Sequence, residues 1–312
     1  MSLDRALELA AAVAGIAYPN PTVGAVVVAD GELVGEGVTE SYGGRHSEIV
    51  ALAAAGDRAS GATLYVTMEP CAHHGKTPPC VDAIVAAGVA RVVAGCLDPN
   101  PEAAGGLAQL RKAGVEAELD DRFGARRQNE AWRTWTAVAR PFVTYKVATT
   151  LDGRVIVPGT RWVTGEASRR LVHELRAASD AVAVGMGTVR ADAPRLDARD
   201  VPVVRQPRRL AFGRGPLPAE SDLELRPGRV AEELEALAAD GVQSILLEGG
   251  PTLATAFLEA GLIDKLLVFV APTLAGAGQR FLDEISVAIS LSHLSARPIG
   301  EDVLLEAYVH AP

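Results

Sequence analysis

Two cysteines and two histidines of this chain lie within one short stretch. Residues Pro70–Cys80 hold two of the three cysteines and two of the six histidines. His46 and Glu48 lie upstream, separated by a single residue. Thiolate sulfur and imidazole nitrogen are ligands that zinc prefers in proteins. We therefore expect His46, Cys71 and Cys80 to bind one zinc ion, with Glu48 beside it.

The spacing of the cysteines fits a loop that connects a strand to a helix. Cys71 follows an apolar strand expected over residues 63–67, and Cys80 opens a helix expected over 81–87. The eight intervening residues let both sulfurs converge on one ion although the cysteines are not one helical turn apart. A position at a helix N-terminus also favours the thiolate form of Cys80.

The position of Glu48 suggests what chemistry this site performs. Three protein ligands leave the fourth tetrahedral position of zinc to a water molecule, whose pKa falls toward about 7. Glu48 can take the proton of that water and deliver it to a ring nitrogen and to departing ammonia. One histidine, a glutamate kept off the metal and two cysteines form the pattern of zinc deaminases. The predicted chemistry is hydrolytic deamination.

Two other interpretations of these residues stay open. A closed structural zinc site could use His73 or His74 as its fourth ligand, although such a site has no use for Glu48. Cys71 and Cys80 could also be ordinary buried thiols without a metal.

The composition is that of a globular protein with two domains of ordinary size. The 312 residues are 48% hydrophobic and 22% charged, which allows sizeable cores. A formal net charge of -9 argues against nonspecific nucleic-acid binding, which depends on Lys and Arg. Three cysteines cannot form a disulfide framework, and the third, Cys96, is expected in the core. Without an apolar signal peptide or a membrane span, we expect a cytoplasmic protein with small-molecule partners.

Helices alternate with strands in the first half, which predicts an α/β fold with a largely parallel sheet. Helical or amphipathic segments are expected over 3–15, 47–55, 81–87, 107–114 and 121–140, and strands over 25–29, 63–67 and 91–95. Arg140–Pro141 interrupts the pattern because the residue before a proline is pushed out of helical geometry. We therefore expect one domain over residues 1–140 and a second over 141–312.

The second half also alternates between the two kinds of element. We expect strands over 142–147, 181–184, 244–247 and 265–270, helices over 231–239 and 252–260, and a loop rich in Pro and Arg over 193–218. Gly249 and Gly250 form a strand-to-helix turn that lets backbone amides approach a phosphate. The turn lacks the G-x-G-x-x-G spacing, so a standard Rossmann domain is not expected. Among eleven arginines over residues 161–214, Arg176, Arg195 and Arg199 are candidates for phosphate binding.

The loop between the cysteines resembles the zinc loop of the bifunctional deaminase-reductases of riboflavin biosynthesis. The tRNA adenosine and cytidine deaminases typically keep only two residues between their cysteines. Residues 18–24 (YPNPTVG) and 98–101 (DPNP) are similar to two further signatures of the same family. The resemblance implies an N-terminal α/β/α sandwich like that of cytidine deaminase. It also implies that Asn20 contacts the pyrimidine and that His73, His74 and Lys76 lie near the substrate.

The resemblance extends over the second half. Residues 146–154 (KVATTLDGR), 162–164 (WVT), 187–192 (GTVRAD) and 248–253 (EGGPTL) are similar, in order, to the landmarks of the family's reductase domain. That similarity implies a C-terminal α/β domain like dihydrofolate reductase that uses NADPH. The implied cofactor residues are Ala148, Trp162, Thr188, Asp192, Gly250, Pro251, Thr252, Leu253, Ala254, Thr255 and Ala256. The implied substrate residues are Thr160, Arg176, Leu196, Arg199 and Glu248.

Some residues of this half depart from the family pattern or have two interpretations. Phe212 and Gly213 stand where the family has an acidic residue and a serine, and the regions 155–161 and 199–229 look shorter. Lys146 and Asp152 could support the substrate, or Lys146 could be a structural ion-pair partner.

The resemblance implies one enzyme with one zinc ion, NADPH and two successive reactions. It would deaminate 2,5-diamino-6-(5-phosphoribosylamino)pyrimidin-4(3H)-one and then reduce the ribosyl group of 5-amino-6-(5-phosphoribosylamino)uracil to ribityl. Three alternatives stay open: a deaminase with an impaired reductase domain, a nucleic-acid base deaminase with an unrelated domain, and a non-catalytic pyrimidine-phosphate binding protein. The sequence also leaves a homo-oligomer open.

Overall fold

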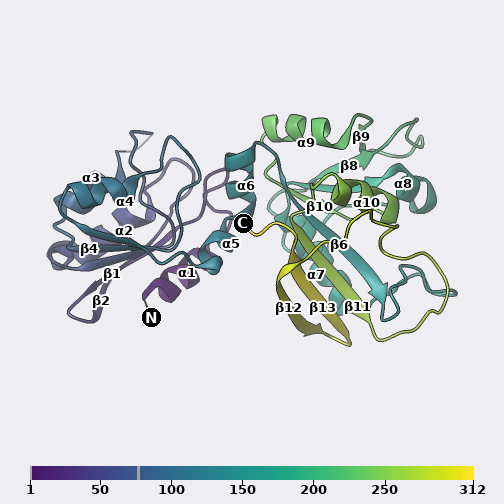
Figure 1. Ribbon diagram of the computed structural model, residues 1–312, viewed down its shortest axis with the longest axis horizontal. Helices are drawn as coiled ribbons and strands as arrows, with labels where there is room; N and C mark the ends of the chain where they lie inside the picture. The colour runs from purple at the N-terminus through teal and green to yellow at the C-terminus, as the bar shows by residue number, and fades with distance from the viewer. Residues whose placement is uncertain (1, 76–77) are drawn as a thin grey trace. The chain divides into compact units, whose positions relative to one another are not determined.

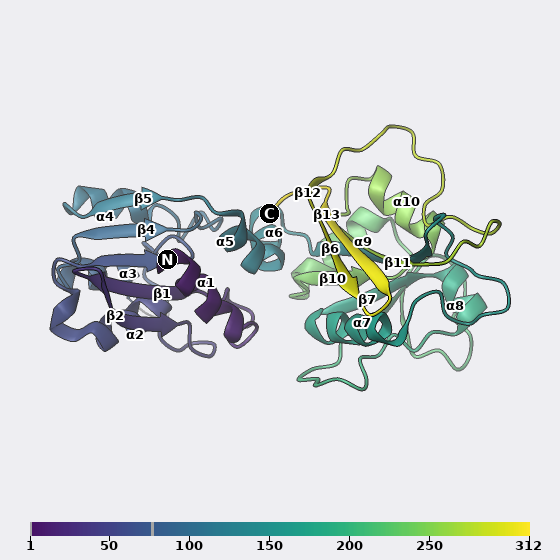
Figure 2. The same cartoon turned by 90° about the horizontal axis from the view of Figure 1, so that it is seen from below.

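The computed structural model describes residues 2–75 and 78–312, so the expected position of Lys76 lies outside the described residues (Figures 1 and 2). The chain divides into two compact units, one ending at Val138 and the other running from Ala139 to Ala311. None of the helices in the described ranges is long and apolar enough to cross a bilayer.

The first unit is built on a five-stranded sheet with the order β2-β1-β3-β4-β5. β1 runs antiparallel to both of its neighbours, while β3, β4 and β5 are parallel. The sheet is therefore mixed, and its antiparallel part follows from the tight β1–β2 hairpin, in which Asp30 and Gly31 both have positive φ. The strands are β1 (Gly24–Ala29), β2 (Glu32–Val38), β3 (Thr63–Val66), β4 (Arg91–Ala94) and β5 (Glu116–Leu119).

Helices cover both faces of this sheet, which confirms the predicted α/β/α sandwich (Figure 2). Apolar residues of α2, α3 and α4 pack on one face around the fully buried Val27 and Leu64. α1 packs on the other face against Val26, and Ala125 of α5 joins a small cluster with Cys96. The helices are α1 (Ser2–Ala12), α2 (Ser47–Ala55), the short 3-10 helix η1 (Gly56–Ala59), α3 (Cys80–Ala86), α4 (Gly106–Lys112), α5 (Phe123–Gln128) and α6 (Glu130–Val138).

The amphipathic segment expected over 121–140 is two helices, because α5 and α6 are separated at Asn129. Asn129 is the residue between the two helices, and its side chain forms two hydrogen bonds with the backbone of Thr22. Its Oδ1 accepts from the Thr22 N–H at 2.9 Å, and its Nδ2 donates to the Thr22 carbonyl at 2.9 Å. A buried tertiary contact thus overrides the helical propensity of the segment.

The second unit is built on an eight-stranded sheet with the order β12-β13-β11-β6-β10-β7-β8-β9. The six strands from β11 to β9 in this order are parallel, and β13 and β12 extend the sheet antiparallel. The strands are β6 (Phe142–Thr150), β7 (Ala181–Gly185), β8 (Arg208–Phe212), β9 (Glu224–Arg226), β10 (Ser244–Leu247), β11 (Lys265–Ala271), β12 (Ser292–Ile299) and β13 (Asp302–Tyr308).

Helices also cover both faces of the second sheet, as expected for an α/β domain. Residues of α7 and α8 pack on one face, where Phe269 and Val184 are buried. Residues of α9 and α10 pack on the other, around Tyr145 and Ile245. The helices are α7 (Glu166–Ala178), α8 (Met186–Asp192), α9 (Val230–Ala239) and α10 (Pro251–Glu259).

The prediction of one loop over residues 193–218 is wrong, because β8 lies within it. Leu210, Ala211 and Phe212 are buried and pair in parallel with β7. Arg208, at the start of the strand, forms an ion pair with Glu224. Arg208 and Arg209 are therefore the polar beginning of a strand whose other residues are buried.

Replacement of Asn129 by alanine should destabilise the first unit by about 2–4 kcal/mol. Two buried backbone groups of Thr22 would lose their partner, and each such loss costs about 1–3 kcal/mol. Asn129→Asp keeps the acceptor for the Thr22 N–H but would place a second acceptor oxygen against the Thr22 carbonyl, so it should also be destabilised. Urea unfolding of the three proteins measures the difference, and equal stability of wild type and Asn129→Ala would contradict this account of the helix break.

Candidate functional site

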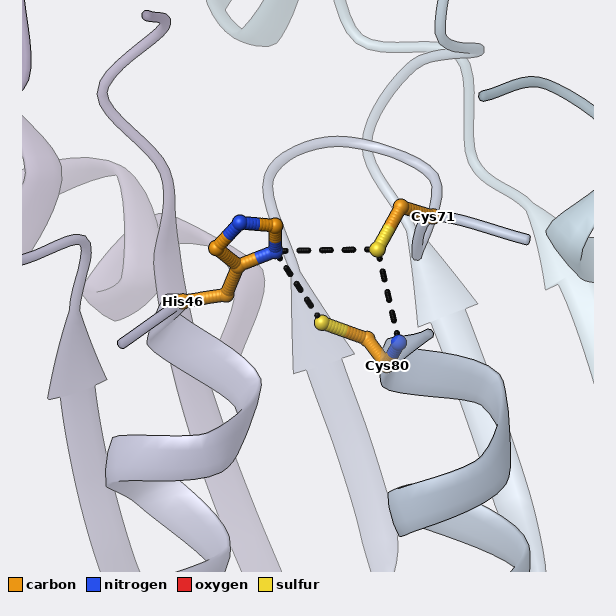
Figure 3. Close-up of side chains that lie close together, drawn as sticks. All are labelled: His46, Cys71 and Cys80. Carbon is orange, nitrogen blue, oxygen red and sulfur yellow. Dashed lines mark hydrogen bonds between the residues drawn. The ribbon is translucent and has the colours of Figure 1, made fainter. Parts of the chain in front are cut away.

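The structure brings together the three residues expected to bind zinc (Figure 3). Nδ1 of His46 lies 3.2 Å from Sγ of Cys80 and 3.6 Å from Sγ of Cys71. The backbone N–H of Cys80 donates to Sγ of Cys71 at 3.3 Å. Within the described ranges, these are the only His, Cys, Asp or Glu ligand atoms that cluster in this way, all within 4.8 Å of one another.

Each ligand lies at the end of an element. His46 is the residue before α2, Cys71 lies in the loop after β3, and Cys80 is the first residue of α3, as predicted. The chain segments beside the ligands are held by close backbone packing. An ideal Cβ on Gly106 would lie only 1.8 Å from the carbonyl oxygen of Pro70, the residue before Cys71.

The donor set and its geometry fit zinc. Zn–S bonds of about 2.3 Å and Zn–N bonds of about 2.0 Å in a tetrahedron separate nitrogen from sulfur by about 3.5 Å, which is close to the distances from His46. Hydrogen bonding with Cys80, followed by His46, lowers the pKa of Cys71, so this sulfur is favoured as thiolate, while the hydrogen bond with Cys71 and burial raise the pKa of Cys80. Both cysteines are buried.

Glu48 lies in the first turn of α2, next to the ligands but outside the cluster of ligand atoms. Its side chain is buried, with the residue 4% exposed, and the hydroxyl of Ser47 donates to Oε2 at 2.9 Å. Burial raises the pKa of Glu48, partly opposed by the charge of His46. A carboxyl group in this environment can hold a proton at higher pH than an exposed one, as a proton carrier must.

A cavity of about 330 Å³ opens beside the ligands. The expected residues Asn20 and His73 line it together with Glu48, His46 and Cys71. His74 is exposed and is not part of the lining. The sequence did not predict three further lining residues, which are Tyr42, Glu69 and Trp132.

Glu69 shapes the pocket by binding the loop after β4 and the start of α4. Its Oε2 accepts from the backbone N–H of Asp98 at 3.3 Å and its Oε1 from that of Leu107 at 3.0 Å. Burial raises the pKa of Asp98 to about 6, and the nearby charge of Glu69 adds to this effect. A carboxylate directly before Pro70 and Cys71, at the end of an apolar strand, was the sequence signal that could have identified Glu69.

The second unit contains a larger cavity, of about 1310 Å³. Most residues that the resemblance implied do line it, namely Ala148, Thr160, Trp162, Arg176, Thr188, Asp192, Arg199, Glu248, Gly250, Pro251, Thr252, Leu253 and Ala256. Ala254 and Leu196 instead pack in apolar clusters, and Thr255 accepts a hydrogen bond from the Asp283 N–H. Those three contacts stay predictions.

Three charged side chains that are largely but not fully buried meet at the wall of this cavity. Arg176 donates to both carboxylate oxygens of Glu248, at 2.6 and 3.0 Å, and Nζ of Lys146 lies 3.7 Å from Oε2. Burial alone would raise the pKa of Glu248, but the charges of Lys146 and Arg176 outweigh it and the net pKa is lowered. Burial lowers the pKa of Lys146. The carboxylate is thus fixed as an anion between two cations.

Asp152 does not line this cavity. It accepts hydrogen bonds from the Thr150 hydroxyl at 2.6 Å and from the backbone N–H groups of Ala275 and Gly276 at 3.0 and 2.8 Å. These bonds lower its pKa to about 2. Asp152 thus connects the end of β6 to the loop after β11 by hydrogen bonds.

The comparisons with known proteins cover both units. Residues 2–96 match the family model of the cytidine and deoxycytidylate deaminase zinc-binding region, and residues 141–305 match the RibD C-terminal domain. The chain is 42% identical to riboflavin biosynthesis protein RibD of Mycobacterium tuberculosis, covering 97% of this chain and 96% of the relative. It is 39% identical to the Aquifex aeolicus protein of the same name, covering 96% and 95%.

Solved structures agree with these matches. Form 1 of Acinetobacter baumannii RibD is 34% identical, with a TM-score of 0.83 over 98% of this chain and 97% of that one. A diaminohydroxyphosphoribosylaminopyrimidine deaminase/5-amino-6-(5-phosphoribosylamino)uracil reductase from Thermotoga maritima is 33% identical, with the same TM-score and coverage.

Fold and sites together define a zinc-dependent deaminase joined to an NADPH-dependent reductase. The chain belongs to the RibD family of riboflavin biosynthesis proteins, so it is a bifunctional deaminase and reductase of that pathway.

Replacement of Gly106 by alanine should disturb the zinc site from a distance. The new Cβ would overlap the Pro70 carbonyl and push the segment that carries Cys71, at a cost of about 1–3 kcal/mol. We expect lower zinc content after dialysis and lower stability in urea. Gly124→Ala is the matched control, because its Cβ would lie 3.6 Å from Leu7 Cδ1, an ordinary contact. Full zinc content in Gly106→Ala would refute this link.

Asp98→Asn should change stability in a pH-dependent way. The pKa of Asp98 in the folded protein is about 6, above the ordinary value of 3.8. Ionisation of Asp98 therefore opposes folding. The stability of the wild-type protein should fall on this account as the pH rises from about 4 to about 6. The variant should therefore gain about 1–3 kcal/mol over wild type at pH 7.5 and little at pH 4.5. Urea unfolding at both pH values measures this gain.

The exposed Asp57 provides the control for that experiment. Asp57→Asn should show no comparable difference between the two pH values. A gain for Asp98→Asn that is equal at both pH values would mean that its origin is not the ionisation of the carboxyl group.

Proposed function

We propose that the first unit carries the deamination and the second the reduction, with residues 1–140 and 141–312 as the two domains. The first substrate is then 2,5-diamino-6-(5-phosphoribosylamino)pyrimidin-4(3H)-one, and the second is 5-amino-6-(5-phosphoribosylamino)uracil. The observation that supports the first assignment best is the buried Glu48 carboxyl beside a His-Cys-Cys cluster at the wall of a cavity. A purely structural metal site would need neither the carboxyl nor the cavity.

In the proposed deamination, zinc held by His46, Cys71 and Cys80 supplies a water of lowered pKa. Glu48 accepts the proton of this water as it attacks the amino-bearing ring carbon. Glu48 would donate this proton to the ring nitrogen, and would then transfer the second proton of the water, from the hydroxyl left on the ring carbon, to the leaving amino group, which departs as ammonia. The Ser47 hydroxyl, 2.9 Å from Oε2, holds the carboxyl in place between these transfers. Asn20, in the wall of the same cavity, contacts the pyrimidine.

In the proposed reduction, NADPH supplies the hydride for C1 of the ring-opened ribosylamine. The turn from Gly250 to Ala256 at the start of α10, with Thr188 and Asp192 of α8, would hold the cofactor. These residues fit that role because the carboxyl ends of the parallel strands β10 and β7 place them along one edge of the cavity. Ala148 and Trp162 complete this set on the β6 side of the cavity.

The substrate would bind at the other part of this cavity. Arg176 and Arg199 are suited to the phosphate because a guanidinium group presents a planar fork of donors. Glu248, fixed as an anion by Lys146 and Arg176, can accept hydrogen bonds from sugar hydroxyls. Thr160 and Leu196 belong to the same proposed set.

Two further properties belong to the same proposal. A cytoplasmic location would keep Cys71 and Cys80 reduced and able to bind zinc. Assembly as a homo-oligomer is compatible with this scheme and is measured by the mass of the protein in solution.

Purified, zinc-loaded protein with the diaminopyrimidine substrate tests the whole scheme. Ammonia should be released without NADPH, and absorbance at the nicotinamide band should fall only when NADPH is present. Ammonia release without NADPH oxidation would favour the alternative of a deaminase with an impaired reductase domain. Absence of both reactions would favour a binding protein.

Glu48→Gln should separate the two activities. Zinc content and oxidation of NADPH with the supplied deaminated intermediate should persist, while ammonia release should fall by at least about 10²-fold because the proton carrier is lost. Glu116→Gln, at an exposed position of β5, is the control. If Glu48→Gln also blocks reduction, the division of labour between the units is wrong.

A further inference from the structure

We infer that His173 is a substrate-binding residue of the reductase, and that its imidazole joins Arg176 and Arg199 in contacting the phosphate of the substrate. The inference rests on the proposed function of the larger cavity. It adds one residue to the substrate site and couples substrate binding to the uptake of a proton by that residue. Neither the motifs of the sequence nor the implied site residues included His173.

The position of His173 places it on the same surface as Arg176. Both residues are on α7, and residues three apart on a helix are neighbours on one face. Both line the cavity, and Arg199 lines it from the segment after α8. Glu248 accepts two of the three hydrogen bonds of Arg176 and the Asp197 carbonyl accepts the third, so the imidazole lies in the charged part of the cavity rather than among its apolar residues.

The imidazole has a buried nitrogen without a hydrogen-bond partner. Nδ1 of His173 is inaccessible to solvent and makes no hydrogen bond to any described residue. Buried polar groups in proteins are nearly always paired, so this unpaired nitrogen in a cavity wall points to a partner that it gains when the imidazole turns toward a bound ligand. Of the unpaired buried side-chain atoms in the described ranges, only those of His173 and His73 belong to imidazoles, and each of these residues lines one of the two cavities.

The charges around His173 favour an anionic ligand. Arg176 of α7 and Arg199 of the following segment act on the imidazole, which also interacts with the backbone and the carboxylate of Asp197 and with the carboxylate of Glu248. Arg195 and Arg199 engage Asp197 at 2.8 and 2.7 Å, and Arg176 and Lys146 engage Glu248. Four cations therefore contact two carboxylates, and positive charge is in excess. A phosphate group, with about two negative charges near neutral pH, would restore the balance.

Substrate binding should therefore be coupled to uptake of a proton. Burial first, and then the charges of Arg176 and Arg199, lower the pKa of His173, so the imidazole is neutral at pH 7 while the cavity is free of ligand. A bound phosphate supplies a negative charge and an acceptor, which favours the imidazolium form. Affinity for a phosphate ester should then fall as pH rises from 6 to 8.

The test uses ribose 5-phosphate as a probe and isothermal titration calorimetry of the full-length protein. Titrations at pH 7 in two buffers of different ionisation enthalpy give the number of protons taken up. We expect His173→Gln to take up fewer protons than wild type and to bind the probe about tenfold more weakly. The phosphate of the probe contributes equally to proton uptake in both proteins. Because glutamine does not titrate, the wild-type value minus the His173→Gln value gives the protons taken up by His173 alone. His310→Gln, at an exposed position outside the cavity, should behave as wild type.

Two further measurements distinguish binding from folding and from catalysis. The dissociation constant for NADPH should be unchanged in His173→Gln, which shows that the unit is folded. With the deaminated intermediate, KM should rise about tenfold while kcat changes little. Equal proton uptake and equal affinity in wild type and His173→Gln, or a fall in kcat at constant KM, overturns the inference and leaves the proposed reductase intact. Failure of the wild type itself to bind ribose 5-phosphate overturns both.

Discussion

The zinc cluster depends on two places where backbone packs on backbone with no room for a side chain. An ideal Cβ on Gly37 of β2 would lie 2.2 Å from the carbonyl oxygen of Ser47, the residue after His46. One on Gly106 would lie 1.8 Å from the carbonyl oxygen of Pro70. These approaches fix the segments that carry the histidine and the first cysteine, whose ligand atoms come from positions 25 residues apart in the chain. The distances between the ligand atoms therefore depend on two glycines that do not themselves bind the metal.

The two units use the ends of their elements in the same way. In the first, His46 and Cys80 lie at the starts of α2 and α3, where the buried N–H group of Cys80 donates a hydrogen bond to the sulfur of Cys71. In the second, the starts of α8 and α10 follow parallel neighbours, β7 and β10. Helix starts offer unpaired amides and a positive field, which suit thiolates in one unit and phosphates in the other. A single architectural rule thus serves two unrelated ligands.

The sequence was most informative where the chemistry of the residues is uncommon. Cysteine and histidine in a chain without a disulfide framework pointed to the zinc ligands, and the alternation of elements pointed to the α/β class. Two of the elements that were missed bury few apolar side chains: α7 buries only Ser168 and Val172, and β12 is exposed along nearly its whole length. Elements of this kind are stabilised by tertiary contacts, which no local pattern records.

The residues that line the reductase cavity could not be identified from the sequence one by one, because they too are brought together only by tertiary structure. Its wall takes single residues of ordinary type from β6, α7, α8 and the end of β10, and only the resemblance to a family connected them. His173 illustrates the limit, since one histidine in an amphipathic helix has no distinctive spacing. Its significance comes from an unpaired nitrogen, which is a property of the folded chain alone.

Two buried glutamates show how the fold assigns different proton chemistry to one residue type. Glu48 has a hydroxyl donor from Ser47, and burial dominates, so its pKa is raised and it can carry protons. Glu248 lies between Lys146 and Arg176, whose charges overcome the same effect of burial and lower its pKa. Hydrolysis of an amine needs a group that changes protonation during the reaction, whereas hydride transfer from a cofactor needs a fixed field around the sugar. The number of cations that contact each carboxylate decides which of the two roles it can take.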